Sequence, residues 1–233
     1  QVEQTANATA TAFGVQAGVQ QTPQTPLQTP SQSSSKVDKV SVTRGLVTIL
    51  APELISGIYA VRTCAHRLLY LVSKLSGTTV ASILSPYRTR LLAPVLQQSL
   101  HAVPMSIRIG YISAATYCLS LRPPLVTVND LLYLLHDAIA DVRDDNGQNY
   151  GGSIAGRTGR VQLLNRLQVE DIKLMSAALA SEDVKQKPGE YQELKNMMIR
   201  VFFRSLLSRT PEIVKVAKEG LKKVIDREKL PKE

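Results

Sequence analysis

The sequence predicts an all-α protein, a solenoid of antiparallel helix pairs that follows a disordered, low-complexity segment. Three observations carry this prediction. Residues 201–225 have the pattern of a helix hairpin, a related pattern recurs at two earlier positions, and no segment has a convincing strand pattern. Because a helix hairpin cannot bury its apolar faces alone, it implies neighbouring helix pairs of the same kind.

The hairpin at 201–225 is defined by a turn and by the helix that follows it. Thr210 can cap the free N–H groups of the second helix, Pro211 suits its first position, and Glu212 places a negative charge at the positive end of the helix dipole. Apolar residues then form one stripe at helical spacing: Ile213, Val214, Ala217, Leu221 and Val224.

A β-branched residue, a base and a later leucine recur at one fixed spacing, with small residues between them. The three sets are Val61, Arg62 and Leu68; Ile172, Lys173 and Leu179; and Val214, Lys215 and Leu221. This pattern is typical of the second helix of a HEAT-type repeat, so we predict a HEAT-like α-solenoid. An irregular helical bundle is the alternative.

Composition divides the chain into five regions. Residues 1–35 are rich in Gln, Thr, Ala, Pro and Ser and carry a single charge, so we predict a disordered linker there. Helical repeats follow at 36–145 and 160–227, separated by a glycine-rich mobile loop at 146–159, and residues 228–233 form a tail. The Thr-Pro pairs of the first region are either sites for proline-directed kinases or parts of an unmodified linker.

Apolar periodicity predicts the individual helices. In the first repeat region they lie at 51–75, 80–84, 88–100, 106–121 and 131–142, with Pro86 and Pro94 as points of bending or restarting. Thr127 and Asp130 resemble a capping box, and Asn129 is an alternative cap. In the second repeat region, helices at 160–180 and 191–207 flank a loop at 181–189 and lead into the hairpin.

The ends and the cysteines indicate the setting of the chain. The first residue is Gln, so we expect a piece of something longer or a processed chain. No apolar run reaches the roughly 20 residues of a membrane span, and no signal segment opens the chain. Cys64 and Cys118 lie far apart in apolar helical patterns, which indicates reduced core residues and a cytosolic or nuclear compartment.

The net charge of +9 raises the question of nucleic-acid binding. The bases are spread over nearly all the helices, and the 5% of aromatic residues includes no Trp, so no stacking platform for single strands is evident. A diffuse positive face that meets an acidic partner, or the acidic part of a larger assembly, is equally consistent. We therefore do not expect direct nucleic-acid binding, although it stays an alternative.

Three groups of residues resemble chemical sites. Residues 151–158 match the spacing of a phosphate-binding loop with Arg157 in place of Lys, but the acidic stretch before them cannot be a core strand. The histidines, His66, His101 and His136, lie far apart, and none has a second His one turn away. The acidic cluster, Asp141, Asp144 and Asp145, lies at a helix C-terminus, so we expect it to fix a helix end rather than form a catalytic pair, with a weak cation site as the alternative. We therefore predict no catalytic, cofactor-binding or metal-ligating residue, no cofactor and no enzyme activity.

Arginines are candidates for a positive ridge. They are Arg88, Arg90, Arg108, Arg122, Arg200, Arg204 and Arg209. A solvated or internally paired face is the commoner outcome for such residues.

Two stretches resemble one known family. Residues 91–135, and most specifically PMSIRIGYISAATYCLSLRPPLVTVND at 104–130, resemble the HEAT-repeat region of the transformation/transcription domain-associated protein (TRRAP) family, which includes fungal counterparts. Residues 201–225 are similar to a second hallmark of the same region. The resemblance covers roughly 36–226 and excludes the low-complexity block, and the glycine-rich loop departs from the family pattern.

The resemblance implies a non-catalytic scaffold. Members of this family are large, mostly solenoidal coactivator subunits of SAGA-type histone acetyltransferase complexes in nuclear chromatin, with a pseudokinase domain near the C-terminus. The expected partners are other subunits of these complexes, acidic transcription-activation domains and flanking repeats of the same chain, without a membrane. The alternative is a basic helical-repeat protein that binds nucleic acid directly.

Overall fold

The computed structural model describes residues 34–97, 100–143 and 154–228, and every regular element in these ranges is helical. The α-helices are α1 (Ser34–Glu53), α2 (Tyr59–Ser76), α3 (Val80–Leu84), α4 (Arg88–Gln97), α5 (Met105–Ser120), α6 (Leu132–Arg143), α7 (Ile154–Leu179), α8 (Glu182–Gln186), α9 (Gln192–Ser205) and α10 (Pro211–Glu228). Two short 3-10 helices, η1 (Ser85–Tyr87) and η2 (Asn129–Leu131), lead into α4 and α6. The predicted all-α class is confirmed.

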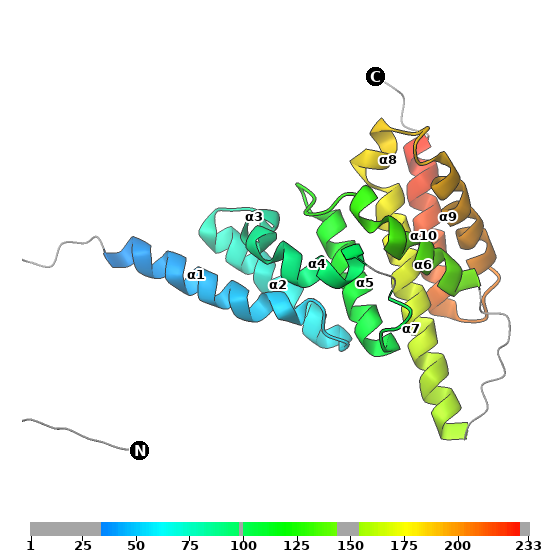
Figure 1. Ribbon diagram of the computed structural model, residues 1–233, viewed down its shortest axis with the longest axis horizontal. Helices are drawn as coiled ribbons and strands as arrows, with labels where there is room; N and C mark the ends of the chain where they lie inside the picture. Colours follow the sequence, from blue (N-terminus) through cyan, green and yellow to red (C-terminus); the bar gives the residue numbers. More distant parts are fainter. Residues whose placement is uncertain (1–33, 98–99, 144–153, 229–233) are drawn as a thin grey trace, which may run out of the picture.

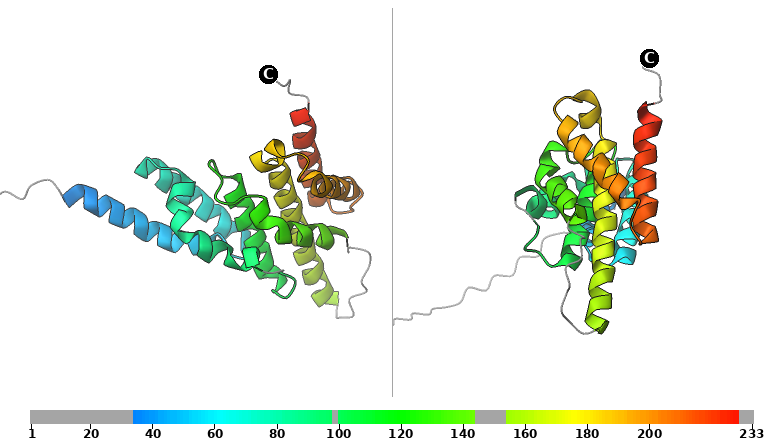
Figure 2. Two further views of the ribbon diagram at one scale, coloured as in Figure 1. Left: turned by 45° about the horizontal axis from the view of Figure 1, so that its top comes forward. Right: turned by 90° about the vertical axis from the view of Figure 1, so that its right-hand side faces the viewer.

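The helices are stacked along an elongated body (Figure 1). The α1–α2 pair forms one end, α5 lies in the middle, and the α9–α10 hairpin lies at the other end, as the turned views of Figure 2 also show. The long helix α7 packs mainly against α5, α6 and α10 and makes a smaller contact with α9, which also packs on α6. The molecule is therefore layered like a helical-repeat solenoid.

A continuous apolar core runs through the whole series of helices. It extends from Val47 and Ala51 in α1, through Leu69 in α2, to Phe202 in α9 and Ile213 in α10. Because one cluster of buried side chains joins all the layers, the described residues form one packed body.

The expected single helix at 51–75 is wrong, because the chain turns between α1 and α2. The last turn of α1 tightens, with the N–H of Leu54 donating to the carbonyl of Ala51 at 3.2 Å and that of Ile55 donating to Pro52 at 3.3 Å. Pro52 and Gly57 bracket this turn, and both residues weaken a helix. The continuous apolar pattern hid the break from sequence analysis.

The close approach of α5 explains why the chain turns there. A Cβ atom on Gly57 would lie 3.1 Å from the carbonyl oxygen of Ser106, and a Cβ atom on Gly110 of α5 would overlap the carbonyl oxygen of Ile55. The turn and α5 therefore touch through backbone, and at Gly110 only glycine allows this approach.

Most of α1 was also missed, because the sequence predicted no helix at 34–50. The other elements agree with the predicted helices except at two places. Ser181 caps the short helix α8, with its hydroxyl accepting from the N–H of Val184 at 3.4 Å, where the sequence predicted a loop. The helix α7 starts at Ile154, so residues 154–159 of the expected glycine-rich loop are helical, and residues 146–153 lie outside the described residues. Pro94 lies inside α4 and does not end it.

The closing hairpin has the predicted form. Pro211 opens α10, and Gly220 lies so close to the ring of Phe202 in α9 that an added Cβ atom would approach it to 3.1 Å. The expected cap by the Thr210 hydroxyl stays a prediction. Small residues between the aliphatics thus allow the two helices to approach closely, as the repeat pattern indicated.

No single helix in the described ranges is long and apolar enough to cross a membrane. Within the same ranges, only α2 taken together with the stretch 80–96, across a bend of 107°, reaches the necessary length and composition.

Candidate functional site

Polar side chains of α7 lie inside the helical stack. Asp171 is completely buried, and Gln168, Glu170 and Ser176 are nearly so. Buried charges are rare unless other polar groups surround them. This polar face of α7 meets α2, α5 and α6 inside the stack.

One group of charges joins α5, α6 and α7; we call it the Arg108 cluster. Arg108 of α5 forms an ion pair with Asp141 of α6, and Asp141 lies 3.8 Å from Nδ1 of His101. Nε2 of His101 lies 3.2 Å from a carboxylate oxygen of Asp137, whose other oxygen accepts the N–H of Leu100 at 3.0 Å. The cluster thus anchors the segment before α5 onto α6.

Asp171 completes the Arg108 cluster from α7. Neither of its carboxylate oxygens has a hydrogen-bond partner among the described residues. Burial raises the pKa of Asp171 well above its usual value, and the nearby charge of Arg108 opposes this shift only in part. Burial likewise lowers the pKa of Arg108.

A second polar group joins α2 to α5 and α7. The guanidinium of Arg62 donates to the carbonyl of Ser56 at 2.6 Å, and the ring of His66 stacks on Tyr117 of α5 with the ring centres 4.0 Å apart. Burial lowers the pKa of Arg62 and of His66, while the carboxylate of Glu170 on α7 opposes both shifts. Burial raises the pKa of Tyr117 to about 12, so this ring stays neutral.

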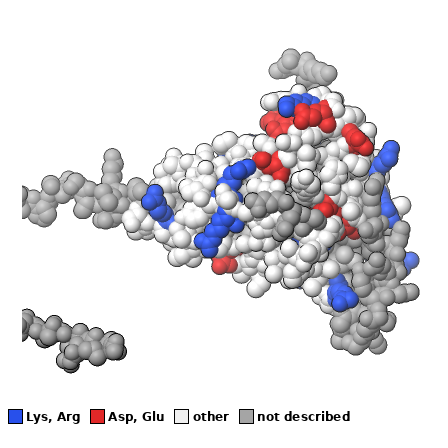
Figure 3. Space-filling view, viewed as in Figure 1, with Lys and Arg blue, Asp and Glu red and all other residues white. Residues whose placement is uncertain are grey.

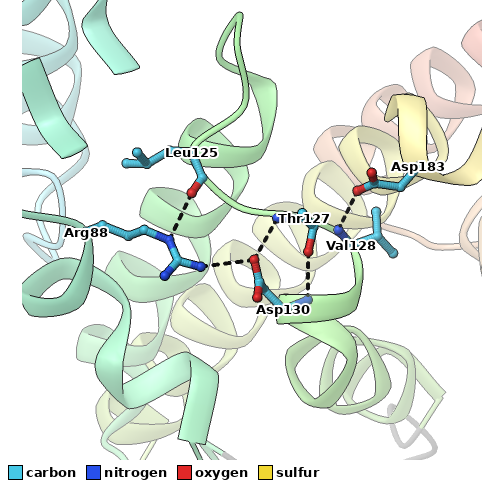
Figure 4. Close-up of polar contacts among 6 residues, drawn as sticks. All are labelled: Arg88, Leu125, Thr127, Val128, Asp130 and Asp183. Atoms are coloured by element: carbon cyan, nitrogen blue, oxygen red, sulfur yellow. Dashed lines mark hydrogen bonds and ion pairs between the residues drawn. The ribbon is translucent and has the colours of Figure 1, made fainter. Parts of the chain in front are cut away.

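The third polar group is a joint between α4, the loop before α6 and α8 (Figure 4). Arg88 donates to the carbonyl of Leu125 at 3.0 Å and to a carboxylate oxygen of Asp130 at 3.1 Å. Asp130 accepts the N–H of Thr127 at 3.0 Å, and its own N–H donates to the Thr127 hydroxyl at 3.2 Å. The predicted capping box is confirmed.

The same joint reaches α8 through the next residue. The N–H of Val128 donates to a carboxylate oxygen of Asp183 at 2.9 Å (Figure 4). In each of the three groups, polar side chains connect different helices. These contacts hold the helices in position relative to one another.

The structure does not bring the predicted look-alike sites together. Among the described residues, no three His, Cys, Asp or Glu side chains are placed to hold a metal ion. His66 stacks on Tyr117, whereas His101 belongs to the Arg108 cluster. His136 lines a shallow pocket beside α9, apart from both. Asp144 and Asp145 lie outside the described residues, as do the first residues of the phosphate-loop look-alike and the side chain of Arg157.

The expected arginine ridge is at least partly an internal structure. Arg88 and Arg108 are paired with Asp130 and Asp141, so they link helices instead of facing a partner.

Cys118 is buried as expected, whereas Cys64 is exposed, so its expected core position is wrong. Burial raises the pKa of Cys118 to about 12, which leaves its thiol protonated and a poor nucleophile.

Sequence analysis missed the polar face of α7. Glu170 and Asp171 read as surface positions because charged residues usually face solvent. One feature of the sequence did indicate their burial, because apolar residues surround them. Leu167 precedes Glu170 and Asp171, and Ile172 and Leu174 follow them. A helix that is apolar on all sides is enclosed by neighbours, so its polar residues are enclosed too.

A groove of about 360 Å³ lies between α5, α7 and α10. Arg122, Lys173 and Lys223 provide basic groups at it, and Glu219 is the acidic one. Leu119 and Val216 are among its apolar lining residues. The nearly buried hydroxyl of Ser176 also lines it and has no hydrogen-bond partner among the described residues.

Stacked helix pairs with one continuous core and internally linked polar groups define a helical-repeat protein of the HEAT class. The chain matches the model of the Tra1 HEAT repeat ring region over residues 8–233, and it belongs to that family. The match confirms the resemblance drawn from 91–135 and 201–225. It also extends into the low-complexity block at 1–35, which the resemblance had excluded.

Relatives in three organisms support this family. The chain is 29% identical over 196 residues to the SAGA complex/NuA4 acetyltransferase complex subunit TRA1 of Saccharomyces cerevisiae. It is 30% identical over 177 residues to the subunit Tra1 of Schizosaccharomyces pombe, and 24% identical over 189 residues to the probable transcription-associated protein 1 of Dictyostelium discoideum. These matches cover 82%, 74% and 79% of this chain but only 5%, 5% and 4% of the relatives.

Proposed function

We propose that this chain is a non-catalytic scaffold segment of a nuclear transcription coactivator subunit, which supports assembly and recruitment of a SAGA-type histone acetyltransferase complex. Membership in the Tra1 HEAT repeat ring family carries the proposal. Two relatives are named as subunits of the SAGA and NuA4 acetyltransferase complexes. Its partners are other subunits of such a complex, acidic activation domains and flanking repeats of the same chain.

The polar interior supports a scaffold role. A scaffold must hold the relative orientation of its layers, and directional contacts do this better than apolar contacts alone. The Arg108 cluster, the Arg62–His66–Glu170 group and the Arg88–Asp130 joint each link helices of different layers. These residues fix geometry and take no part in a chemical step.

The groove between α5, α7 and α10 supports contact with acidic activation domains. Such segments bind by placing apolar side chains in a groove while acidic residues meet bases around it. Leu119 and Val216 provide the apolar lining, and Arg122 and Lys223 provide exposed bases. We expect R122E with K223E to weaken binding of an acidic amphipathic peptide to the full-length protein, measured by fluorescence anisotropy.

The matched control for the groove is K222E, because Lys222 is exposed on the same helix but does not line the groove. Equal loss of peptide binding in R122E/K223E and in K222E would mean that the overall charge of the protein governs binding. That result would contradict the groove as the binding site.

Affinity purification of the full-length protein, with mass spectrometry of the co-purified proteins, tests the scaffold role. We expect acetyltransferase-complex subunits with the intact protein, and loss of a subset of them when residues 36–226 are deleted. Recovery of ribosomal or other RNA-bound proteins instead would overturn the proposal and favour the nucleic-acid alternative. In that case binding to DNA or RNA would fall steeply with salt concentration.

A further inference from the structure

Helices α1 and α2 each have a second apolar stripe that nothing in the described structure covers; we call these the outer stripes. In α1 the exposed residues Val42, Leu46 and Ile49 follow one another at helical spacing, on a different face from the buried Val47 and Ala51. In α2 the outer stripe consists of Cys64, Leu68, Leu71 and Leu75, and Leu75 is 90% exposed. A helix that is apolar on two faces normally lies between two layers.

The three repeated sequence sets allow the outer stripe of α2 to be compared with the matching positions of α7 and α10. Aligning the three repeated sets places Leu68 of α2 on Leu179 of α7, and Cys64 on Met175 of α7 and Ala217 of α10. Leu68 is 41% exposed, whereas Leu179 is 6% exposed and Met175 is fully buried. The same pattern positions are thus buried where another layer is present and open where the stack ends at α2.

The charges beside the outer stripe of α2 indicate the chemistry of the missing layer. Arg67 and Lys74 are exposed, α2 contains no acidic residue, and no acidic side chain among the described residues forms an ion pair with either base. From residue 41 to residue 122 the chain has eight Lys and Arg residues and a single acid, Glu53. Figure 3 shows the same asymmetry, because acidic side chains gather around α8, away from this end.

We propose that the outer stripes of α1 and α2 are the docking surface for a further helix pair of the same polypeptide, which presents an apolar stripe flanked by Asp or Glu to Arg67 and Lys74. The proposal deepens the proposed scaffold function by assigning the surface and its partner. The occupant is intramolecular because this chain spans only 5% of its relatives TRA1 and Tra1, so nearly all of such a polypeptide lies outside the structure. Adjacent layers in a solenoid are supplied by the same chain.

Cys64 reports directly on whether the outer stripe of α2 is covered. We expect Cys64 of the native full-length protein to react with a thiol reagent at least about tenfold more slowly than in the unfolded protein. L71E should restore fast reaction of Cys64, because a carboxylate in the stripe opposes apolar packing. The matched control is S76E, since Ser76 is exposed on the same helix but off the stripe. Cys118 should stay protected in every variant.

Zero-length carbodiimide cross-linking identifies the occupant in the native wild-type protein and does not depend on any variant folding. Lys74 should join to an Asp or Glu residue of the same polypeptide outside residues 1–233. Mixing isotope-labelled and unlabelled protein separates this outcome from a second copy. A cross-link to another protein or to a second copy overturns the proposal, as does reaction of Cys64 at the unfolded rate. Either result leaves the affinity-purification test of the scaffold function untouched.

Discussion

Asp171 and Asp130 have pKa values shifted in opposite directions by their surroundings. Burial raises the pKa of Asp171, whose carboxylate oxygens have no hydrogen-bond partner among the described residues. Burial alone would also raise the pKa of Asp130, but hydrogen bonds from Thr127 and the charge and hydrogen bond of Arg88 outweigh it and lower that pKa. The stability that Asp171 contributes is therefore lost as pH rises, and that of Asp130 is lost as pH falls.

We expect D171N to be more stable than the wild-type protein at neutral pH. The raised pKa means that folded Asp171 binds its proton more tightly than unfolded Asp171, so its contribution is fully present below the ordinary value of 3.8 and falls as pH rises through the raised pKa. Asparagine lacks this dependence. The stability difference, measured by urea unfolding from acid to neutral pH, should grow with pH; a difference that shrinks with pH would contradict the assignment.

Gly110 is the position where a single methyl group should cost most. In G110A the new Cβ atom would overlap the backbone carbonyl of Ile55, and backbone cannot move aside as a side chain can. We expect a loss of about 1–3 kcal/mol of unfolding free energy, measured by thermal or urea unfolding. The control G45A, in open space within α1, should instead stabilise by up to about 1 kcal/mol. Equal effects of G110A and G45A on the unfolding free energy would contradict a close backbone contact between α5 and the turn after α1.

At the scale of elements, local signals were predictable and breaks in a continuous apolar pattern were not. The Pro211 helix start and the Thr127–Asp130 capping box involve residues close in sequence, so sequence analysis identified them correctly. The break after α1 depends on α5, which packs onto it from a distant part of the chain. The helix α8 was missed because Ser181, its cap, lies in a polar stretch that reads as a loop.

The polar links between helices were beyond sequence analysis for the same reason. Arg88 and Asp130 were each noticed, as a ridge residue and as a cap, but their contact spans two elements. The pairing of Arg108 with Asp141 likewise joins α5 to α6. Residue type and spacing cannot give such pairs, because they follow from how the helices stack.

The capping box should contribute more to stability than the ion pair beside it. We expect T127A to cost about 1 kcal/mol, because the N–H of Asp130 loses its acceptor. R88A should cost less through its half-exposed ion pair, which contributes about 0.2–1 kcal/mol by analogy with exposed pairs. The measurement is urea unfolding, with T127S as the conservative control. A wild-type stability for T127A, or a loss in T127S as large as in T127A, would contradict this order.

At the scale of the whole molecule, exposed apolar residues concentrate at the two ends. Leu71 and Leu75 lie on α2, whereas Phe203 and Leu207 lie at the turn of the α9–α10 hairpin, and Leu207 is 85% exposed. Contiguous apolar surface on a free protein promotes association. Among the described residues of α3 to α8, by contrast, the only large apolar side chains that are exposed are those of Ile107, Tyr133 and Val161.

We expect residues 34–228, produced alone, to self-associate at micromolar concentration. Replacing Leu68, Leu71 and Leu75 together by Glu should increase the monomer fraction, because the outer stripe of α2 then carries charge. Size-exclusion chromatography with light scattering measures this fraction. The control replaces Lys218, Lys222 and Lys223 of α10 by Glu, which changes charge without touching the outer stripes. A wild-type segment that is monomeric and melts cooperatively would contradict the prediction.

The central position of α6 and α7 has a mechanical consequence. Among the described helices, these two stand between α5 and the α9–α10 hairpin, so a load applied across the segment passes through their side contacts. A bend that slides α7 against α5 would move the buried Asp171 past Arg108. The charges enclosed by α7 therefore resist bending of this segment, in addition to the apolar core that joins its layers.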